Sequence, residues 1–412
     1  MQLAKVKNVN PFVMLFVITG FQLICFLTLI TSVAEEFRTG VLISFGGYLL
    51  VEYAYFIGTA VILKRRAFEV ELIAFLLTSI GLSITASVYP DGILKQFIAV
   101  VIGIAGFVLL QVFMRDLKLC IAVRVPIAVI AVGLLAFTLV FASVTNGAKN
   151  WVYLGGISIQ PSELVKVAFI FVGSATLEKL QSNKSLTKFI VFALGCVGML
   201  FLMYDFGTAL IFFFTFIVIS FMRSGDVRTI ALVCTVALMG GLLVLIFRPY
   251  VANRFAAYGH VWEYFDSSGY QQTRTMIYSA SGGLFGVGLG NGKLRDIFAA
   301  TEDLVFGVVC EEFGMIMAGA ILLSYVALLV YSIRHSKYAR SSFYAICACA
   351  TASLFLFQAA LNVFGVNDIL PLTGVTLPFV SRGGSSIISC WMLLAFIKAV
   401  DRNTYRYGGV RS

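Results

Sequence analysis

The stretch PFVMLFVITGFQLICFLTLITSV, from Pro11 to Val33, runs for 23 residues without a charged side chain. A helix rises about 1.5 Å per residue, so a run of this length crosses the roughly 30 Å hydrocarbon core of a bilayer. The run is longer than the apolar core of a signal peptide, and no small-residue cleavage site follows it. We therefore expect it to be retained as a first transmembrane helix.

Eleven further apolar runs of roughly 17 to 25 residues follow, which is the length range of membrane-crossing helices. With 60% apolar and 12% charged residues, the chain falls outside the class of ordinary soluble domains. We predict an all-α fold, a polytopic membrane helical bundle of about 12 transmembrane helices with one long extracellular loop at 248–302. The spans are placed near 11–33, 41–63, 69–88, 96–114, 123–144, 162–179, 187–203, 205–222, 228–247, 303–333, 341–365 and 384–400.

Basic residues indicate the orientation of this bundle. They collect in alternate connections, and 20 of the 30 Lys and Arg residues fall on one side of the membrane, although its loops are shorter. The positive-inside bias makes that side cytoplasmic and places both termini inside. The net charge of +10 is mostly this signal plus attraction to anionic lipid headgroups, and no basic and aromatic stripe indicates nucleic acid binding.

Cysteine and histidine are poorly placed for metal binding. All eight cysteines lie inside predicted helices, where thiols behave as small apolar side chains, so no external disulfide is expected. The chain has only His260 and His335, and the orientation assigns His335 to the cytoplasmic side. A metal site built from His and Cys is therefore not expected.

The strongest active-site candidate is Asp303. The one long polar excursion of the chain ends at Thr301-Glu302-Asp303, where an apolar helix begins. Few other ionisable groups exist in a chain this apolar, so a carboxylate at the membrane edge is a natural place for chemistry.

A second polar motif, Gln160-Pro161-Ser162-Glu163-Leu164-Val165-Lys166, opens a helix from the outer side. Proline suits the first turn of a helix, and Glu163 and Lys166, three residues apart, share one face. One interpretation is a helix start with a local ion pair. The other is a polar chamber, because ionisable residues at membrane depth usually face a cavity.

Three further polar features have structural explanations. Glu52, in the second span, has only Tyr53 and Tyr55 nearby and is interpreted as structural. Asp205 begins a helix, where a carboxylate satisfies free backbone N–H groups, so capping explains it. The glycine string 281–292 lets backbone N–H groups approach an anion, but without a strand and helix around it we interpret it as a flexible loop.

Further polar residues follow Asp303. Glu311 and Glu312 lie about 12 Å deeper along the predicted helix. At about 100° per residue, Glu311 is about 80° from Asp303 around the axis and Glu312 is on the opposite side, so in a regular helix Glu311 is the better placed partner. Gln358 and Asn362 share one face of a later helix, and 371–386 is rich enough in proline and glycine to be a re-entrant segment.

Together these stretches resemble the SEDS family of bacterial cell-wall glycan polymerases, the rod-shape, division and sporulation proteins. The resemblance rests on the order of the motifs as well as on their content, and it covers residues 69–402, the ten-helix family core. The motifs are Gln160-Pro161-Ser162-Glu163, Asp205-Phe206-Gly207-Thr208, Gly269-Tyr270-Gln271, the 282–292 glycine string, Asp303 with Glu311-Glu312-Phe313-Gly314, and Pro371-Leu372-Thr373-Gly374 through Ser386.

The chain departs from the family pattern at its N-terminal end and within motifs. Residues 1–68 supply two extra N-terminal transmembrane helices, and 403–412 form a cytoplasmic tail. Thr301-Glu302 stands where the family commonly has His-Thr, Met203-Tyr204 where it has Gln-Pro, and Arg382 where it has Tyr. These changes bear on the subfamily and on substrate contacts.

The resemblance implies polymerisation of lipid II outside the membrane by an inverting glycosyl transfer, with undecaprenyl pyrophosphate as the leaving group. Asp303 is then the expected catalytic base, as in inverting glycosidases. Lys166, Arg254 and Arg382 are expected to balance the charge of the departing pyrophosphate, with a divalent cation such as Mg²⁺ or Mn²⁺ as a possible addition. No organic cofactor is expected.

The resemblance also implies the remaining contacts. The expected partners are lipid II, glycan linked to undecaprenyl pyrophosphate, and a single-pass class B penicillin-binding protein that acts as transpeptidase. The expected location is the bacterial plasma membrane, with the active site on the outer face and a role in elongation, division or sporulation. The other expected substrate-binding residues are Trp151, Glu163, Gln271, Glu311, Glu312, Gln358, Asn362, Thr373, Ser381, Ser385 and Ser386.

Two other functions stay open at this point. A transporter or flippase for the lipid-linked precursor is compatible with a polytopic bundle in which Glu52, Glu163 and Lys166 line a path, although the sequence has no convincing internal repeat. A non-catalytic scaffold of a wall-synthesis complex is supported only by the family's habit of pairing with a transpeptidase.

Overall fold

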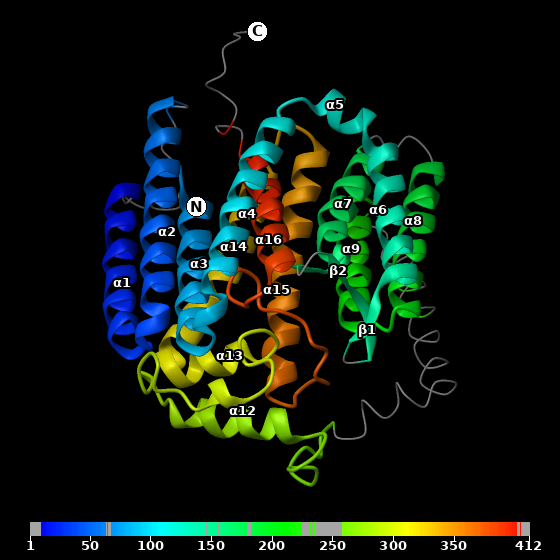
Figure 1. Cartoon of the computed structure of the whole chain (residues 1–412). Helices are drawn as coiled ribbons and strands as arrows, with labels where there is room; N and C mark the ends of the chain where they lie inside the picture. Colours follow the sequence, from blue (N-terminus) through cyan, green and yellow to red (C-terminus); the bar gives the residue numbers. More distant parts are fainter. Residues whose placement is uncertain are drawn as a thin grey trace, which may run out of the picture.

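The computed structural model describes residues 10–62, 64, 67–145, 147–154, 157–178, 183–224, 231, 235, 258–401 and 404. Long helices stand side by side and form a bundle (Figure 1). In chain order they are α1 (Pro11–Ser32), α2 (Glu35–Ile62), α3 (Glu69–Val88), α4 (Ile93–Phe113), α6 (Arg124–Phe141), α7 (Pro161–Leu177), α8 (Asn183–Leu202), α9 (Phe206–Ser224), α14 (Gly314–Ser336), α15 (Ser342–Val366) and α16 (Gly384–Ala399).

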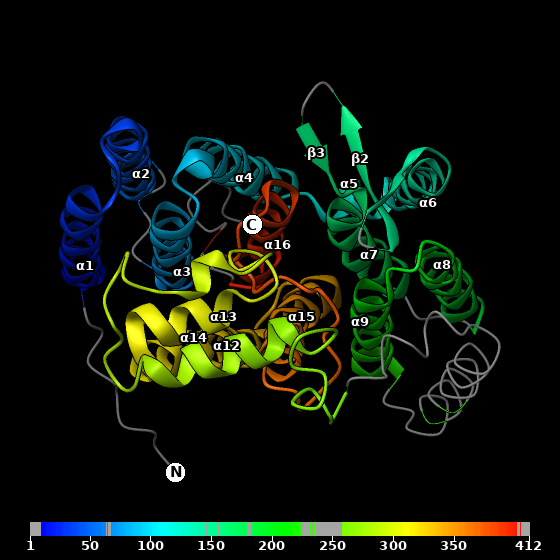
Figure 2. The same ribbon diagram turned by 60° about the horizontal axis from the view of Figure 1, so that its bottom comes forward.

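Shorter elements connect these helices. They are the 3₁₀ turns η1 (Pro90–Gly92) and η2 (Leu294–Asp296), the helices α5 (Leu117–Ala122), α12 (Tyr270–Ser281) and α13 (Val305–Val308), and the π turn η3 (Val309–Phe313). Figure 2 shows α12 and α13 lying across one end of the bundle. The predicted long loop therefore contains a helix of its own.

The predicted polytopic helical bundle is confirmed. Within the described residues, eight helices are long and apolar enough to cross a membrane, and the shorter helices Leu186–Leu202 and Gly384–Ala399 are also apolar. The predicted span 228–247 lies outside the described residues, except that positions 231 and 235 are helical. The predicted tail 403–412 also lies outside them, apart from position 404.

One predicted connection is instead part of a helix. The apolar runs predict a link between the first two spans at 34–40, but α2 already begins at Glu35. Glu35 and Glu36 occupy its first turn, where negative charge interacts favourably with the free N–H groups and the helix dipole. The two acidic residues extend the helix beyond its apolar run.

A small sheet lies in the connection between the predicted spans 123–144 and 162–179. Strands β1 (Ser143–Thr145), β2 (Ala148–Leu154) and β3 (Ile157–Ile159) form an antiparallel meander in the order β1-β2-β3. Gly147, with φ of +79°, supplies the left-handed residue of the first turn. The backbone N–H of Lys149 donates to the Met203 carbonyl at 2.8 Å, which fixes the sheet to the end of α8.

The centre of the bundle packs around Trp391 on α16. Its ring is fully buried and meets Phe75, Phe107 and Phe379 with centroid distances of 4.9, 5.8 and 5.8 Å. A Cβ on Gly103 of α4 would lie 3.0 Å from the Trp391 Cβ, so glycine allows the two helices to approach closely. Aromatic contacts of this kind hold α3, α4 and α16 together.

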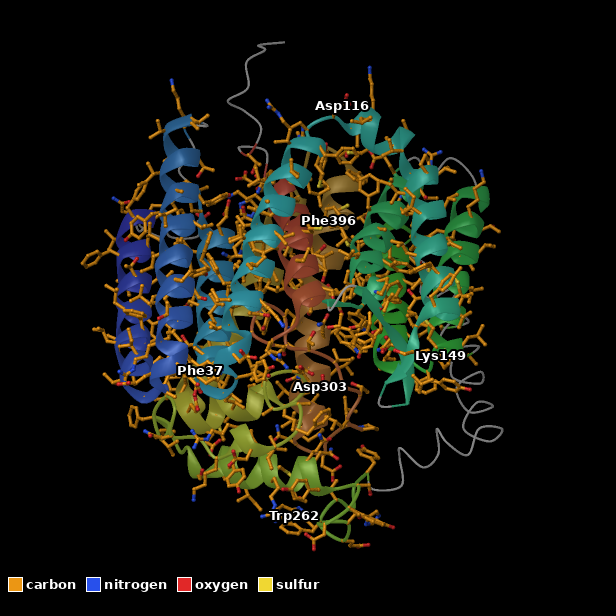
Figure 3. All side chains as sticks on the ribbon, in the orientation of Figure 1. Phe37, Asp116, Lys149, Trp262, Asp303 and Phe396 are labelled. Carbon is orange, nitrogen blue, oxygen red and sulfur yellow. The ribbon has the colours of Figure 1, made fainter. Side chains whose placement is uncertain are left out.

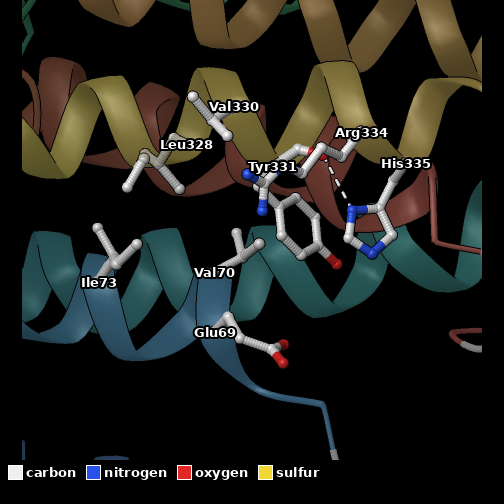
Figure 4. Close-up of a pocket in the computed structure, with 9 residues that line it drawn as sticks. Glu69, Val70, Ile73, Leu328, Val330, Tyr331, Arg334 and His335 are labelled. Carbon is white, nitrogen blue, oxygen red and sulfur yellow. Dashed lines mark hydrogen bonds between the residues drawn. The ribbon is translucent and has the colours of Figure 1, made fainter. Parts of the chain in front are cut away.

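A cavity of about 290 Å³ lies between the start of α3 and the end of α14 (Figure 4). Val70, Ile73 and Leu328 form part of its apolar wall, and Arg334 and His335 lie on its lining near Glu69. Along α3 the cavity is about 28 Å from the helix end that precedes Tyr89. It is therefore remote from the site described below.

One buried ion pair ties the first turn of α3 to the last turn of α16. Lys398 Nζ lies 3.0 Å from Glu71 Oε2, and both side chains are almost completely buried. Lys398 also donates to the Ala67 carbonyl at 2.7 Å, and the Tyr55 hydroxyl donates to Glu71 Oε1 at 3.1 Å. Protein groups thus compensate both charges.

We expect Glu71→Ala to lower the free energy of unfolding by about 3–5 kcal/mol, because it leaves the Lys398 ammonium buried without its counter-ion. Thermal unfolding of the purified protein in detergent measures the effect. The matched control is Glu35→Ala, which breaks the exposed Arg38–Glu35 pair and should change the midpoint little. Equal midpoint shifts for the two variants would contradict a stabilising role for the buried pair.

Candidate active site

Asp303 lies in the connection between η2 and α13, at the end of the bundle that carries α12 (Figure 3). The N–H groups of Glu302, Asp303 and Leu304 all point to the Ala299 carbonyl, at 3.0, 3.1 and 3.3 Å. Ala299 itself has a φ of +61°, so the chain makes a tight turn just before the aspartate. This turn fixes the backbone of Asp303.

The Asp303 carboxylate is half-buried and faces the proline- and glycine-rich segment 371–383. A Cβ on Gly374, which has a φ of +67°, would lie 3.4 Å from Asp303 Oδ2. No side-chain hydrogen bond to this carboxylate occurs among the described residues, so both of its oxygens are free to accept a proton or a ligand. The absence of a partner at both oxygens distinguishes it from Glu302, Asp205 and Glu311, each of which is bonded through its side chain.

Asn362 connects Asp303 to that segment. Its Nδ2 donates to the Asp303 carbonyl at 2.8 Å and to the Val375 carbonyl at 2.7 Å, and the side chain is buried. One amide on α15 therefore sets the distance between the aspartate and segment 371–383. Asn362, expected among the substrate-binding residues, here contacts the backbone of Asp303.

The electrostatic environment favours the protonated form of Asp303. Burial, with smaller contributions from the neighbouring charges of Glu302 and Asp205, raises the pKa of Asp303 from 3.8 to about 7. A carboxyl group with this pKa exchanges its proton near neutral pH, which is the property required of a general base. The aspartate has both the free oxygens and the proton affinity for that role.

Arg382 is bonded to the turn that carries this aspartate. Its backbone N–H donates to the Thr301 carbonyl at 2.7 Å, its Nε donates to Thr301 Oγ1 at 3.0 Å, and its Nη2 pairs with Glu302. The guanidinium also stacks on the Tyr89 ring, 4.2 Å from the centroid. No acceptor is bonded to Nη1 within the described parts of the chain, so one corner of this cation is available to a ligand.

Ser381 is used for folding rather than for ligand contact. Its hydroxyl donates to the Glu302 carbonyl at 2.6 Å and accepts from the Leu377 N–H at 2.8 Å. Gln96 of α4 accepts from the Gly383 N–H at 3.1 Å. These bonds join segment 371–383 to the turn that carries Asp303.

Glu163 and Lys166 form the expected ion pair, 2.8 Å apart, and both side chains are buried. Lys166 Nζ also donates to Gln358 Oε1 at 3.2 Å, and the Ser389 hydroxyl donates to Glu163 Oε2 at 2.9 Å. The pair therefore faces a packed polar network between α7, α15 and α16. Direct contact of either residue with a substrate is not supported by this geometry.

The same network reaches segment 371–383. Gln358 Nε2 donates to the Thr376 carbonyl at 2.8 Å and to Thr376 Oγ1 at 3.1 Å. Thr376 Oγ1 lies 2.9 Å from the Ser386 hydroxyl, while the Ser385 hydroxyl accepts from the Gln160 N–H at 3.3 Å. These side chains position the segment against α7, α15 and α16.

Asp205 caps α9, as its sequence position indicates. Its Oδ1 accepts from the Thr208 N–H at 3.2 Å. Its Oδ2 accepts from Asn150 Nδ2 at 3.1 Å and from Gln160 Nε2 at 3.2 Å, two contacts that the sequence did not single out. The carboxylate thus joins the small sheet to the starts of α7 and α9.

Thr373 and Trp151 lie near this junction. A Cβ on Gly207, in the first turn of α9, would lie 2.8 Å from the Thr373 carbonyl, so glycine lets the segment pack closely. The Thr373 hydroxyl oxygen is buried without a hydrogen-bond partner among the described residues. Trp151 is half-buried on β2, where it pairs with Ser143.

The expected helical geometry of Glu311 and Glu312 is wrong, because residues 309–313 form a π turn instead of a regular α-helix. Glu311 accepts from the N–H groups of Lys293 and Leu294, at 2.7 and 2.9 Å. Glu312 Oε1 accepts from the Ser87 hydroxyl at 2.6 Å. Glu311 is therefore bound to the loop backbone instead of serving as a free partner of Asp303.

The glycine string is an ordered element in contact with these glutamates. The N–H groups of Val287 and Gly288 donate to the carbonyls of Glu311 and Glu312, at 2.8 and 3.1 Å. A Cβ on Gly292 would lie 2.9 and 3.0 Å from the two carboxylates. The flexible-loop interpretation is therefore wrong, because the backbone of the string is hydrogen-bonded to the backbone of the π turn.

Two expected substrate contacts remain. Gln271, on α12, donates from Nε2 to the Phe298 carbonyl at 3.1 Å, which holds α12 against the loop that leads to Asp303. Arg254 lies outside the described residues.

We expect Asp303→Asn to stabilise the protein above pH 7 and to have little effect near pH 4. The native pKa is higher than the unfolded one, so ionised Asp303 destabilises the native state. This penalty is small near pH 4, where the unfolded carboxyl titrates, grows as pH rises, and is complete above pH 7. Its upper limit is about 4 kcal/mol. Unfolding in detergent at the two pH values measures it, and a variant with the wild-type pH dependence would contradict the assigned environment.

Comparison with known proteins identifies a family. The family model of the FtsW, RodA and SpoVE cell cycle proteins matches residues 66–406. The stage V sporulation protein E of Bacillus subtilis is 32% identical over 266 residues, covering 63% of this chain and 73% of that protein. The peptidoglycan glycosyltransferase RodA of Mycobacterium tuberculosis is 29% identical over 336 residues, covering 76% and 71%.

Solved structures show the same fold. A chain of a peptidoglycan synthase complex, described in terms of polymerization and crosslinking, superimposes with a TM-score of 0.68 at 24% identity, covering 82% of this chain and 98% of that one. The rod shape determining protein RodA of Thermus thermophilus gives a TM-score of 0.62 at 24% identity, with the same coverage. The probable peptidoglycan glycosyltransferase FtsW of Coxiella burnetii is 33% identical over 309 residues, covering 69% of this chain and 82% of that protein. The resemblance noted in the sequence is thereby confirmed, and the chain belongs to the FtsW, RodA and SpoVE family of cell cycle proteins.

Proposed function

We propose that this protein is a peptidoglycan glycosyltransferase that polymerises lipid II, with Asp303 as the general base. The observation that carries the proposal is a half-buried carboxylate with free oxygens and a pKa of about 7, held between a tight turn and segment 371–383. Relatives named peptidoglycan glycosyltransferase in Mycobacterium tuberculosis and Coxiella burnetii support the choice of reaction.

The proposed reaction is one in-line displacement with inversion. Asp303 takes the proton of the sugar 4-hydroxyl while the oxygen of that hydroxyl forms a bond to the anomeric carbon of the growing chain. The bond from that carbon to the pyrophosphate breaks, and undecaprenyl pyrophosphate leaves with the electron pair. Because the sugar hydroxyl displaces the pyrophosphate directly, no covalent enzyme intermediate is required.

Arg382 is the described cation best placed to balance the leaving group. It lies beside the turn that carries Asp303, it is partly exposed, and its Nη1 has no acceptor among the described residues. Lys166 is less suitable because it is buried in its pair with Glu163. A positioned guanidinium stabilises the negative charge that develops on the pyrophosphate.

A divalent cation such as Mg²⁺ is compatible with these residues as part of the proposal. Mg²⁺ sites commonly use one or two carboxylates, with water and substrate phosphates completing the ligands. Asp303 offers one carboxylate with free oxygens, whereas Glu302 and Asp205 are already bonded to Arg382 and to amide donors. Such an ion would supply positive charge at the pyrophosphate.

We place the active site on the outer face of the bacterial plasma membrane and both termini in the cytoplasm. Basic residues support this orientation: Arg340 on one connection donates to the carbonyls of Met114 and Arg115 on another, at the end of the bundle away from Asp303. Figure 3 shows Asp116 at that end and Asp303 toward the other. The partner proposed is a single-pass transpeptidase of the penicillin-binding class, since the fold is shared with a chain of a peptidoglycan synthase complex.

The transporter alternative has less support. A path through the bundle needs polar groups that are open to a substrate, but Glu163 and Lys166 are bonded to each other and to Ser389 and Gln358. The scaffold alternative leaves the raised pKa and the free oxygens of Asp303 without a role.

We expect Asp303→Asn to reduce lipid II polymerisation by at least about 100-fold, because the amide cannot accept the hydroxyl proton. The wild-type kcat/KM should fall as pH is lowered through about 7, where the base becomes protonated. Glycan chain synthesis from labelled lipid II, with and without a penicillin-binding protein, measures both effects. Asp296→Asn, in the same loop and largely exposed, is the control. Full activity of the Asp303 variant would refute its role.

We expect Arg382→Ala to lower kcat by about 100-fold and Arg382→Lys to lower it less, because lysine keeps the charge but not the planar fork. The matched control is Arg295→Ala, which removes an exposed arginine from the same face. Measuring kcat and KM for lipid II separates leaving-group stabilisation from simple binding. Wild-type kcat in the alanine variant would exclude this role for Arg382.

A further inference from the structure

A buried polar pair joins the two helices that precede the segment matched by the family model. Gln22 on α1 and Glu52 on α2 are completely buried, and Gln22 Nε2 donates to Glu52 Oε2 at 2.8 Å. A carboxylate inside the membrane is costly unless it is paired or neutralised. The part of the chain that the structure describes offers no cation in an ion pair with Glu52.

The hydrogen bonds at this pair are incomplete in one specific way. Gln22 Oε1 and Glu52 Oε1 are both buried, and neither has a hydrogen-bond partner among the described residues. Two acceptors without a donor are satisfied together if Glu52 carries a proton, because a carboxylic acid donates from one oxygen and accepts at the other.

The described ionisable groups on the neighbouring elements supply no positive charge that could compensate an ionised Glu52. The Tyr48 hydroxyl donates to the Phe75 carbonyl at 2.6 Å, and Cys25 on α1 is buried. Glu71 on α3 is already paired with Lys398. A neutral acid on Glu52 is therefore the state that completes the hydrogen bonding of this pair.

The hairpin of α1 and α2 also contacts the active-site loop. A Cβ on Gly290 would lie 2.8 Å from Ser32 Oγ at the end of α1, and the Phe21 and Phe313 rings are 6.1 Å apart. The Gly290 N–H donates to Ser87 Oγ at 3.0 Å, and Ser87 in turn donates to Glu312. Helix α1 thus touches both the glycine string and the π turn of the segment that begins at Asp303.

We propose that Glu52 is held as a neutral acid in a reciprocal pair with Gln22, and that this pair fixes the α1–α2 hairpin as a positioning element for the glycine string and the π turn. Gln22 and Glu52 are positioning residues, remote from the reacting atoms. The catalytic part of this inference rests on the proposed function, whereas the protonation and the loop contact do not.

The protonation is tested by infrared spectroscopy of the full-length protein in lipid vesicles at pH 7. The wild-type spectrum should contain a protonated-carboxyl C=O band that is absent from Glu52→Gln, whose amide can still pair with Gln22. A difference spectrum without that band would overturn the neutral acid. This measurement is independent of any enzymatic activity.

The loop contact is tested by hydrogen exchange. In Glu52→Leu, which leaves Gln22 unpaired, amides in 286–294 should exchange about threefold to tenfold faster, the range expected for an interhelical hydrogen bond in a membrane. Glu52→Gln should restore the wild-type rate, and α15 serves as an internal reference. Faster exchange confined to α1 and α2, with 286–294 unchanged, would overturn the positioning role.

Activity supplies the final readout. Lipid II polymerisation should show a lower kcat with a similar KM in Glu52→Leu, and rescue in Glu52→Gln. If wild-type protein fails to polymerise lipid II, the proposed function fails while the infrared and exchange results still decide this inference. Unchanged kcat in Glu52→Leu, beside faster exchange of 286–294, would remove the catalytic consequence.

Discussion

Irregular backbone at the membrane edge must find its hydrogen-bond partners inside the protein, and the site depends on how this constraint is met in segment 371–383. Its carbonyls are bonded by side chains from the surrounding helices: Asn362 reaches Val375, Gln358 reaches Thr376, and the Tyr325 hydroxyl reaches Pro378 at 2.6 Å. Close packing also restrains the segment: a Cβ on Gly81 would lie 2.6 Å from the Val380 carbonyl, so only glycine allows α3 to approach it this closely. The segment is consequently held in one shape beside Asp303.

The acidic groups near this segment differ in how they are compensated. Asp205 has three donors, Glu302 has Arg382, Glu163 has Lys166, and Glu311 has two backbone N–H groups. Among these five, Asp303 is the one with no hydrogen bond or ion pair to either carboxylate oxygen within the described residues, and its pKa is raised by burial. Since each of the other four already has at least one hydrogen-bond or ion-pair partner, Asp303 is the carboxylate of this group best suited to proton transfer.

The fold was predictable because the length of an apolar run identifies a membrane-crossing helix, as in Pro11–Ser32 and Ser342–Val366. Asp303 was chosen as a candidate because it ends the long polar excursion just before an apolar helix. The places where prediction failed are local. The π turn at 309–313 has no periodic signal, so Glu311 could not be assigned to the loop backbone. Strands β1 and β3 have three residues each, which is too short for alternation of apolar and polar residues to be recognised. The contacts of Asn150 and Gln160 with Asp205 join residues far apart in sequence, which no local pattern records.

These observations imply a compromise between stability and chemistry at Asp303. A carboxylate with a raised pKa destabilises the native state when it ionises. The surrounding structure therefore has to keep Asp303 from moving to a position where the ionised form is better solvated. Asn362 does so by binding the Asp303 carbonyl, and the Ala299 turn does so by binding the N–H groups on either side. Both restraints act on the backbone and leave the carboxylate oxygens free. A side-chain restraint of equal strength would have satisfied those oxygens and lowered the proton affinity on which a general base depends.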